Sequence, residues 1–154
     1  MQCGTRVCGK ETWPGAGGSA LLLIDASAFI EFLNRTGSRE DTLIEQLIRD
    51  DEDIALADIT LTEILQGIKT DREYRDVKAS LLTFPLLSLH STESYIAAAE
   101  LYRKCRKKGL TIRSTVDLLI AQIALEHRAT LLHNDRDFDA LAQVCDIKIY
   151  DSSS

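Results

Sequence analysis

Five carboxylates stand at positions where they could hold a divalent cation. They come from four separate segments of the chain: Asp25, Glu63, Asp117, Asp135 and Asp137. Each also has a simpler explanation, because Asp, Ser or Thr at a helix start accepts hydrogen bonds from free N–H groups. Thr60 with Glu63 matches the Ser/Thr-x-x-Glu capping box, and Ser114 precedes Asp117 by the same spacing. The choice between caps and a shared site depends on where the fold places the five acids.

The elements around these acids alternate between strands and helices. The run LLLI at residues 21–24 leads directly into Asp25. Such a short apolar run is typical of a strand buried on both faces of a parallel sheet. Similar runs predict strands at residues 54–57, 86–89, 129–133 and 146–150. The order of elements predicts an α/β fold, a three-layer α/β/α sandwich with a parallel, five-stranded sheet and right-handed crossovers.

Helices are predicted between these strands. Apolar spacing and capping residues place them at residues 27–34, 41–49, from 60, 71–84, 91–108, from 113 and 138–144. Ser91 or Thr92 would begin the long helix, and Gly109 would end it.

This topology brings the acids together at the carboxyl ends of the strands, which is where open α/β sheets bind ligands. Two like charges about 4 Å apart repel by about 4 kcal/mol at an effective dielectric constant of about 20. Either raised pKa values or bound cations must therefore offset the repulsion. Oxygen ligands without a nearby His/Cys set favour Mg²⁺ or Mn²⁺. The acids are thus predicted to support two-metal phosphoryl chemistry.

A basic cluster closes the predicted helix at residues 91–108. Its members are Arg103, Lys104, Arg106, Lys107 and Lys108. Cations stabilise a helix C-terminus, but five in six residues exceed what that role needs, so a phosphate-binding patch is a second interpretation. The formal net charge of −6 argues against nucleic-acid binding through overall charge, although it leaves room for a local patch.

The remaining composition indicates a single globular domain over residues 20–151, with 45% hydrophobic residues. Residues 1–19 have no apolar period or signal-peptide core and are interpreted as a flexible, dispensable leader, either a tag or the product of an upstream start. The cysteines lack zinc-site spacing, which fits a reduced, cytoplasmic setting. No apolar run is long enough to predict a membrane span.

The acidic segments also resemble a known family. LLIDASAF, LTEILQG, STVDLLIA and LLHNDRDF are similar to the four acidic motifs of PIN domains, in the same order. Their spacing and the compact chain resemble the VapC-type toxins of bacterial toxin–antitoxin pairs in particular. The resemblance covers roughly residues 20–150.

This resemblance implies an endoribonuclease that uses Mg²⁺ or Mn²⁺ and acts on structured RNA such as tRNA or rRNA. Asp25, Glu63 and Asp117 would hold the first metal, and Asp135, with or without Asp137, would complete the pocket or hold a second. The RNA backbone would meet Arg113 and the basic cluster. A cytoplasmic antitoxin protein and a homodimer are further implications of the family.

Two residues near the acids are assigned supporting roles by the same resemblance. Ser27 would orient a carboxylate or water. His133 stands where many relatives have Thr, and it is a candidate donor to the pocket.

Three alternatives remain open at this point. A Mg²⁺-dependent phosphatase or receiver-like domain also keeps acids at strand ends, but Asp25-Ala26-Ser27 lacks the second acid of a D-x-D loop. A catalytically silent PIN domain would bind RNA or a partner without metal-dependent turnover. An RNA-processing PIN nuclease would cleave RNA without an antitoxin.

Overall fold

The computed structural model describes residues 20–151. The predicted leader, residues 1–19, lies outside the described residues, as do residues 152–154. Within residues 20–151 no helix is both long enough and apolar enough to span a membrane.

The core of the fold is a five-stranded sheet in which every neighbouring pair is parallel. Its strands run in the spatial order β3-β2-β1-β4-β5. Their bounds are β1 (Leu22–Ile24), β2 (Ile54–Ala57), β3 (Leu86–Leu87), β4 (Thr130–Leu132) and β5 (Lys148–Ile149). The predicted parallel five-stranded sheet is confirmed, although β3 and β5 are each only two residues long.

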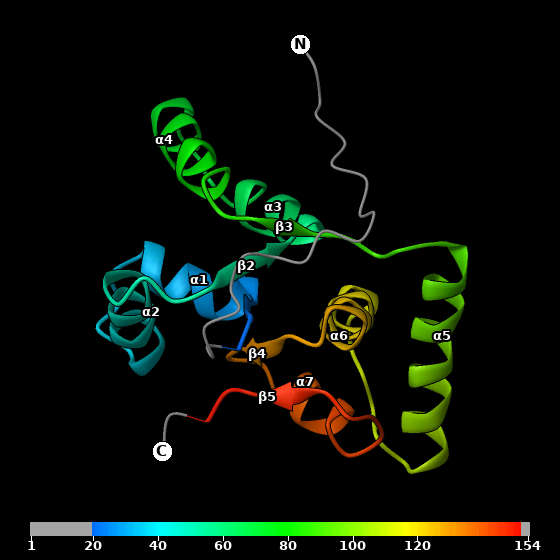
Figure 1. Ribbon diagram of the computed structural model, residues 1–154. Helices are drawn as coiled ribbons and strands as arrows, with labels where there is room; N and C mark the ends of the chain where they lie inside the picture. The colour runs from blue at the N-terminus through cyan, green and yellow to red at the C-terminus, as the bar shows by residue number, and fades with distance from the viewer. Residues whose placement is uncertain (1–19, 152–154) are drawn as a thin grey trace.

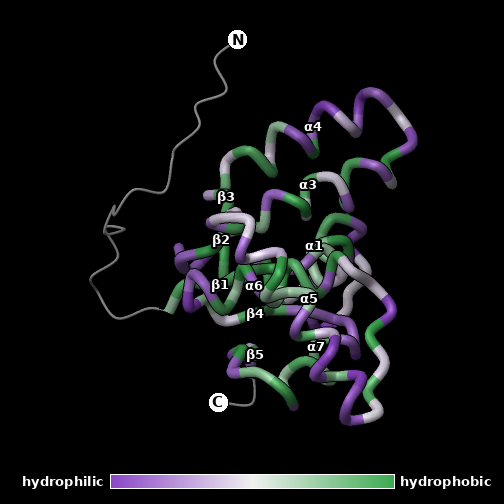
Figure 2. The backbone as a smooth tube through the Cα atoms, turned by 90° about the vertical axis from the view of Figure 1, so that its right-hand side faces the viewer, coloured by the Kyte–Doolittle hydropathy of each residue, from purple (hydrophilic) through white to green (hydrophobic). Residues whose placement is uncertain are grey.

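Helices cover both faces of this sheet, which confirms the predicted three-layer sandwich. They are α1 (Ala26–Leu33), α2 (Arg39–Arg49), α3 (Asp58–Leu65), α4 (Asp71–Leu81), α5 (Thr92–Lys107), α6 (Thr115–His127) and α7 (Arg136–Leu141). Figure 1 shows α1 and α2 on one side of the sheet and α5 and α6 on the other. The helix α4 lies at the edge of the molecule, and Figure 2 shows its outer part in hydrophilic colours.

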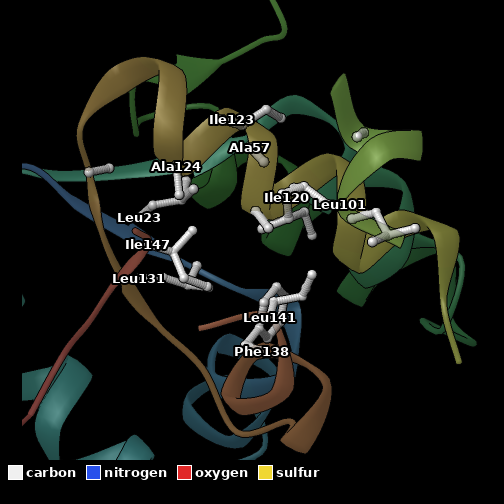
Figure 3. Close-up of a cluster of buried hydrophobic side chains, with 14 of the residues drawn as sticks. Leu23, Ala57, Leu101, Ile120, Ile123, Ala124, Leu131, Phe138, Leu141 and Ile147 are labelled. Carbon is white, nitrogen blue, oxygen red and sulfur yellow. The ribbon is translucent and has the colours of Figure 1, made fainter. Parts of the chain in front are cut away.

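The two layers follow from the alternation of side chains along each strand. In β1, Leu22 and Ile24 join a buried cluster with Phe29 of α1 and Ile44 of α2. Leu23 points the other way, into a second cluster that includes residues of α5, α6 and α7 (Figure 3). Because β1 is buried on both faces, its sequence has to be apolar throughout, as the run LLI is.

The ends of α5 agree with the predicted signals. Ser91 is the N-cap residue, and its backbone N–H donates to the Ser94 hydroxyl at 3.2 Å. Gly109 has a φ of 72°, the left-handed conformation that glycine adopts without strain just after a helix.

The predicted capping box at Thr60 and Glu63 is wrong. The helix α3 already begins at Asp58, so both residues lie inside it, and its N-cap residue, Ala57, has no capping side chain. Thr60 is fully buried rather than facing the helix start. Tertiary packing therefore determines where α3 begins, and Glu63 does not cap this helix.

Candidate active site

Asp25 is both a helix cap and a candidate metal ligand, the two roles that the sequence leaves open. It follows β1 and caps α1, because one carboxylate oxygen, Oδ2, accepts hydrogen bonds from the Ser27 backbone N–H at 2.9 Å and from the Ser27 hydroxyl. The other oxygen, Oδ1, is buried and has no hydrogen-bond partner. Burial raises the pKa of Asp25 despite the bonds from Ser27. Capping therefore occupies only half of this carboxylate.

The ends of the central strands are tied together next to Asp25. The Asp25 backbone N–H donates to the Leu132 carbonyl at 2.9 Å, and the Ser27 hydroxyl accepts from the Asn134 backbone N–H at 2.9 Å. These bonds join the residues after β1 to the residues after β4. The chain order reverses between these two strands, which is the position where open α/β sheets form their ligand crevice.

Glu63 and Asp117 bring two more carboxylates to this edge. Glu63 lies in α3, which follows β2, while Asp117 lies in the first turn of α6 and is 6% exposed. Glu63 Oε2 and Asp117 Oδ2 are both buried and lack hydrogen-bond partners. Burial, followed by the charge of Asp25, raises the pKa of each group to about 7.

Asp135 and Asp137 complete the acidic edge after β4. One carboxylate oxygen from each of Asp117, Asp135 and Asp137 lies within 4.8 Å of the others. Asp25 and Glu63 are not in this group of three, but both raise the pKa of Asp117 through their charge. Asp135 also caps α7, since its Oδ1 accepts from the Asp137 backbone N–H at 3.0 Å.

Arg113 binds the two acids of this last segment. Its backbone N–H donates to Asp137 Oδ2 at 2.7 Å and its Nε donates to Asp137 Oδ1 at 3.1 Å. Its Nη2 donates to Asp135 Oδ1 at 2.8 Å. Burial raises the pKa of Asp137, but the hydrogen bonds from Arg113 outweigh burial and hold that pKa below its ordinary value. From the sequence alone Arg113 is predicted to contact RNA, and this ion pair with two of the acids is not apparent there.

His133 supports Asp135 from the other side. Its side chain is 7% exposed and packs against the Phe138 ring at a centroid distance of 5.0 Å. The Asp135 backbone N–H donates to His133 Nδ1 at 3.1 Å. In this contact the imidazole accepts a hydrogen bond, whereas the sequence indicates His133 as a candidate hydrogen-bond donor to the pocket. In the neutral ring the proton then sits on Nε2, which lies 3.5 Å from Asp139 Oδ1.

The basic cluster belongs to a different segment from the acids, the C-terminal end of α5. Its five members occupy the last turns and the C-cap of α5, and all are exposed. Lys108 Nζ donates to the Gln143 carbonyl at 3.2 Å. Among residues 20–151, only Arg113 of the six predicted RNA-binding residues forms an ion pair with the acids.

The site has the properties that a divalent cation requires. Within residues 20–151, three buried carboxylate oxygens, on Asp25, Glu63 and Asp117, have no hydrogen-bond donor. Leaving such groups buried and unpaired is costly unless a cation or a proton compensates them. The donor atoms are all carboxylate oxygens, which suit Mg²⁺ or Mn²⁺. The residues present therefore fit a divalent metal ion.

Comparisons with known proteins agree with this arrangement. The family model of the PIN domain matches residues 22–144. Ribonuclease VapC11 from Mycobacterium tuberculosis strain H37Rv is 33% identical over 129 residues, which cover 83% of this chain and 96% of that protein. VapC ribonuclease Mb1587 from Mycobacterium bovis gives the same identity and coverage.

Solved structures resemble this fold as well. VapBC2 from Rickettsia felis, bound to a DNA fragment from its promoter, has a TM-score of 0.67 at 21% identity and covers 84% of this chain and 97% of its own. VapBC-1 from nontypeable Haemophilus influenzae has a TM-score of 0.65 at 19% identity, covering 85% and 97%. At these identities the likeness concerns the fold alone.

Proposed function

This chain belongs to the PIN-domain family, and from that premise we propose that it is an endoribonuclease that depends on Mg²⁺ or Mn²⁺ and acts as the toxin of a toxin–antitoxin pair. The observation that carries the nuclease activity is the set of buried, unpartnered carboxylate oxygens at one sheet edge. The relatives named VapC ribonucleases, at 33% identity, support the ribonuclease activity.

In this proposal the acids divide into two groups. Asp25, Glu63 and Asp117 hold one cation, and Asp135, with or without Asp137, completes the pocket or holds a second. A bound divalent cation supplies Lewis-acid activation of water and offsets the negative charge that develops on the phosphate. Ser27 keeps Asp25 Oδ2 occupied, so that Oδ1 remains directed to the pocket as a ligand.

The protein itself needs no nucleophilic side chain for this chemistry. The carboxylates bind and orient. Burial, followed by the charges of neighbouring acids, raises the pKa values of Glu63 and Asp117 to about 7, so the site disfavours their ionised forms unless a cation is bound. The negative charges of these acids would also repel an approaching RNA phosphate. Cationic groups outside the pocket therefore have to hold the RNA backbone, and the exposed basic cluster at the end of α5 is suited to this.

The partners follow from the same assignment. The substrate is structured RNA, tRNA or rRNA, and a cognate antitoxin protein covers the acidic pocket in the cytoplasm. We also propose that the toxin forms a homodimer. The similar solved structures include a toxin–antitoxin complex from Klebsiella pneumoniae and VapBC-5 from Mycobacterium tuberculosis, a member of the VapBC family of toxin–antitoxin systems, which supports the antitoxin partner.

A cleavage assay on total cellular RNA tests this function. The protein would be incubated with Mn²⁺, with Mg²⁺ or with EDTA, as wild type and as Asp117→Asn. Asp76→Asn is the matched control, since it removes the same charge from an exposed acid on α4 that is not one of the five acids of the site. We expect discrete, metal-dependent fragments from wild type and from Asp76→Asn, and none from Asp117→Asn.

The other results have distinct meanings. Equal products from all proteins and in EDTA would indicate a contaminating nuclease. Metal-dependent products that are equal for wild type and Asp117→Asn would refute the assignment of this site. RNA binding without metal-dependent products would favour a silent PIN domain. Cleavage that the product of an adjacent antitoxin gene does not inhibit would favour an RNA-processing nuclease over a toxin.

A further inference from the structure

Arg113 is the one lysine or arginine in residues 20–151 that forms an ion pair with any of the five acids. It lies in the segment that joins α5 to α6, directly before the N-cap residue of α6, Ser114. Its acidic partners are 22 and 24 residues further along the chain, after β4. Arg113 therefore connects the start of α6, which carries Asp117, to the segment that carries Asp135.

The contacts of Arg113 are made by its backbone as well as by its guanidinium. The backbone N–H and Nε bind separate oxygens of Asp137, at 2.7 Å and 3.1 Å, while Nη2 reaches Asp135 Oδ1 at 2.8 Å. A guanidinium presents its donors in a fixed planar fork, so these bonds set the distance between the two carboxylates. Asp137 thus anchors the arginine, and the arginine orients Asp135.

The same atoms define the spacing of the acidic group. Asp117, Asp135 and Asp137 each place an oxygen within 4.8 Å of the others. The Asp135 backbone is also fixed, because its N–H donates to His133 Nδ1 at 3.1 Å. Without the bond to Oδ1 from Arg113, the remaining donor to that oxygen is the Asp137 backbone N–H, and the Asp135 carboxylate gains freedom to rotate away from Asp117.

We propose that Arg113 is a positioning residue that holds the Asp135 carboxylate opposite Asp117 at metal-binding distance, and that it does not act mainly as an RNA contact. This inference rests on the proposed metal site. Arg113 then helps to form the metal site before RNA binds, and the basic cluster of α5 binds the RNA backbone.

The effect of replacing Arg113 on Mn²⁺ affinity has opposite signs under the competing explanations. Removing a cation from an acidic pocket strengthens Mn²⁺ binding if Arg113 only supplies charge. Losing the orientation of a ligand weakens it, and groups that hold metal ligands in place commonly contribute about 10- to 100-fold in metal affinity or activity. A purely RNA-binding arginine leaves Mn²⁺ affinity unchanged.

The experiment is a calorimetric titration of the full chain with Mn²⁺ alone, without RNA. The proteins are wild type, Arg113→Gln, Arg113→Lys and the control Arg49→Gln, which breaks an exposed ion pair with Glu45 on α2. We expect Arg113→Gln to weaken Mn²⁺ binding about 10-fold or more. Arg113→Lys keeps the charge without the fork and should weaken binding too, while Arg49→Gln should match wild type.

Each alternative result contradicts a particular step. Tighter or unchanged Mn²⁺ binding by Arg113→Gln, with wild-type binding intact, overturns the role of Arg113 and leaves the metal site standing. Wild-type Mn²⁺ affinity in Arg113→Lys would show that the planar fork of the guanidinium is not required and would also overturn the positioning role. Absence of Mn²⁺ binding in wild type would overturn the metal site itself. Circular dichroism of each variant confirms that folded proteins are being compared.

Discussion

Replacing Asp117 by Asn should stabilise the metal-free protein, although it should abolish activity. Asp117 is 6% exposed, its Oδ2 has no hydrogen-bond partner, and burial together with the charges of Asp25, Asp135, Asp137 and Glu63 raises its pKa from 3.8 to about 7. The folded state therefore binds a proton more tightly than the unfolded state does. Stability contributed by the protonated group is present below pH 3.8 and is lost as the pH rises to about 7.

The size of this loss follows from the pKa. At about 1.4 kcal/mol per pH unit, the difference between 3.8 and about 7 corresponds to an upper limit of about 4 kcal/mol. The pKa of Glu63 is also raised to about 7, by burial and then by the charge of Asp25, so the cost of the metal-free site is spread over more than one acid. We expect about half of the limit, or about 2 kcal/mol, to be recovered at pH 8 in Asp117→Asn. For a chain of 154 residues this raises the Tm by about 6 °C.

Thermal unfolding followed by circular dichroism measures this effect. In EDTA, the Tm difference between Asp117→Asn and wild type should be near zero at pH 4, grow up to pH 7 and stay constant above it. Excess Mn²⁺ should then stabilise wild type more than the variant, by about 2.7 kcal/mol at 100 times the Kd. Asp76→Asn should follow wild type throughout. A lower Tm for Asp117→Asn than for wild type at pH 8 in EDTA would refute the inference that burial and the neighbouring charges make this ionised carboxylate destabilising.

Three further predictions follow from other contacts. Lys107→Glu with Lys108→Glu should weaken RNA binding and reduce the slope of log K against log salt by about 1.5, as two lost phosphate contacts require; unchanged binding over a salt series would remove the basic cluster from the interface. Ser27→Ala removes the bond to Asp25 and the tie to the loop after β4, and should lower Mn²⁺ affinity about 10-fold in a calorimetric titration, an effect that wild-type affinity would contradict. Phe29 is 1% exposed and its ring contacts Phe32 and Phe84 edge to face, so Phe29→Ala should lower the free energy of unfolding, measured with urea, by about 3–5 kcal/mol. Tyr74→Ala on the exposed α4 is the control, and an equal, small decrease for both variants would argue against this packing.

The sheet could be predicted because its strands are buried on both faces. Leu22, Leu23 and Ile24 contact helices on alternating sides, so no polar residue interrupts the run, and the pattern is visible in the sequence. The same reasoning correctly placed the acids after the strands, because the ends of parallel strands share one edge. The short strands β3 and β5 were located less accurately, since two residues produce little periodicity.

Local capping patterns were less reliable than burial. Thr60 and Glu63 matched a capping box, yet α3 begins two residues earlier and Thr60 is fully buried. Asp25 shows the opposite result, because it caps α1 and still leaves one oxygen for the pocket. A spacing rule describes what a residue can do locally, whereas neighbouring helices and strands determine which oxygen remains available.

The ion pair between Arg113 and the acids after β4 could not be read from the sequence. The partners are separated by 22 and 24 residues, and they meet only because α6 carries the chain away from this edge of the sheet and β4 returns it there. The acceptor role of His133 likewise depends on the conformation of the turn that places the Asp135 N–H against Nδ1. Both contacts are products of the fold.

We propose that acids from four separate segments of the chain form one site for divalent cations. Its most direct test is anomalous diffraction from crystals of the protein soaked in Mn²⁺. We expect an anomalous peak between the carboxylates of Asp25, Glu63, Asp117 and Asp135, and no such peak in crystals of Asp117→Asn grown under the same conditions. A peak elsewhere, or none at this edge of the sheet, would contradict it.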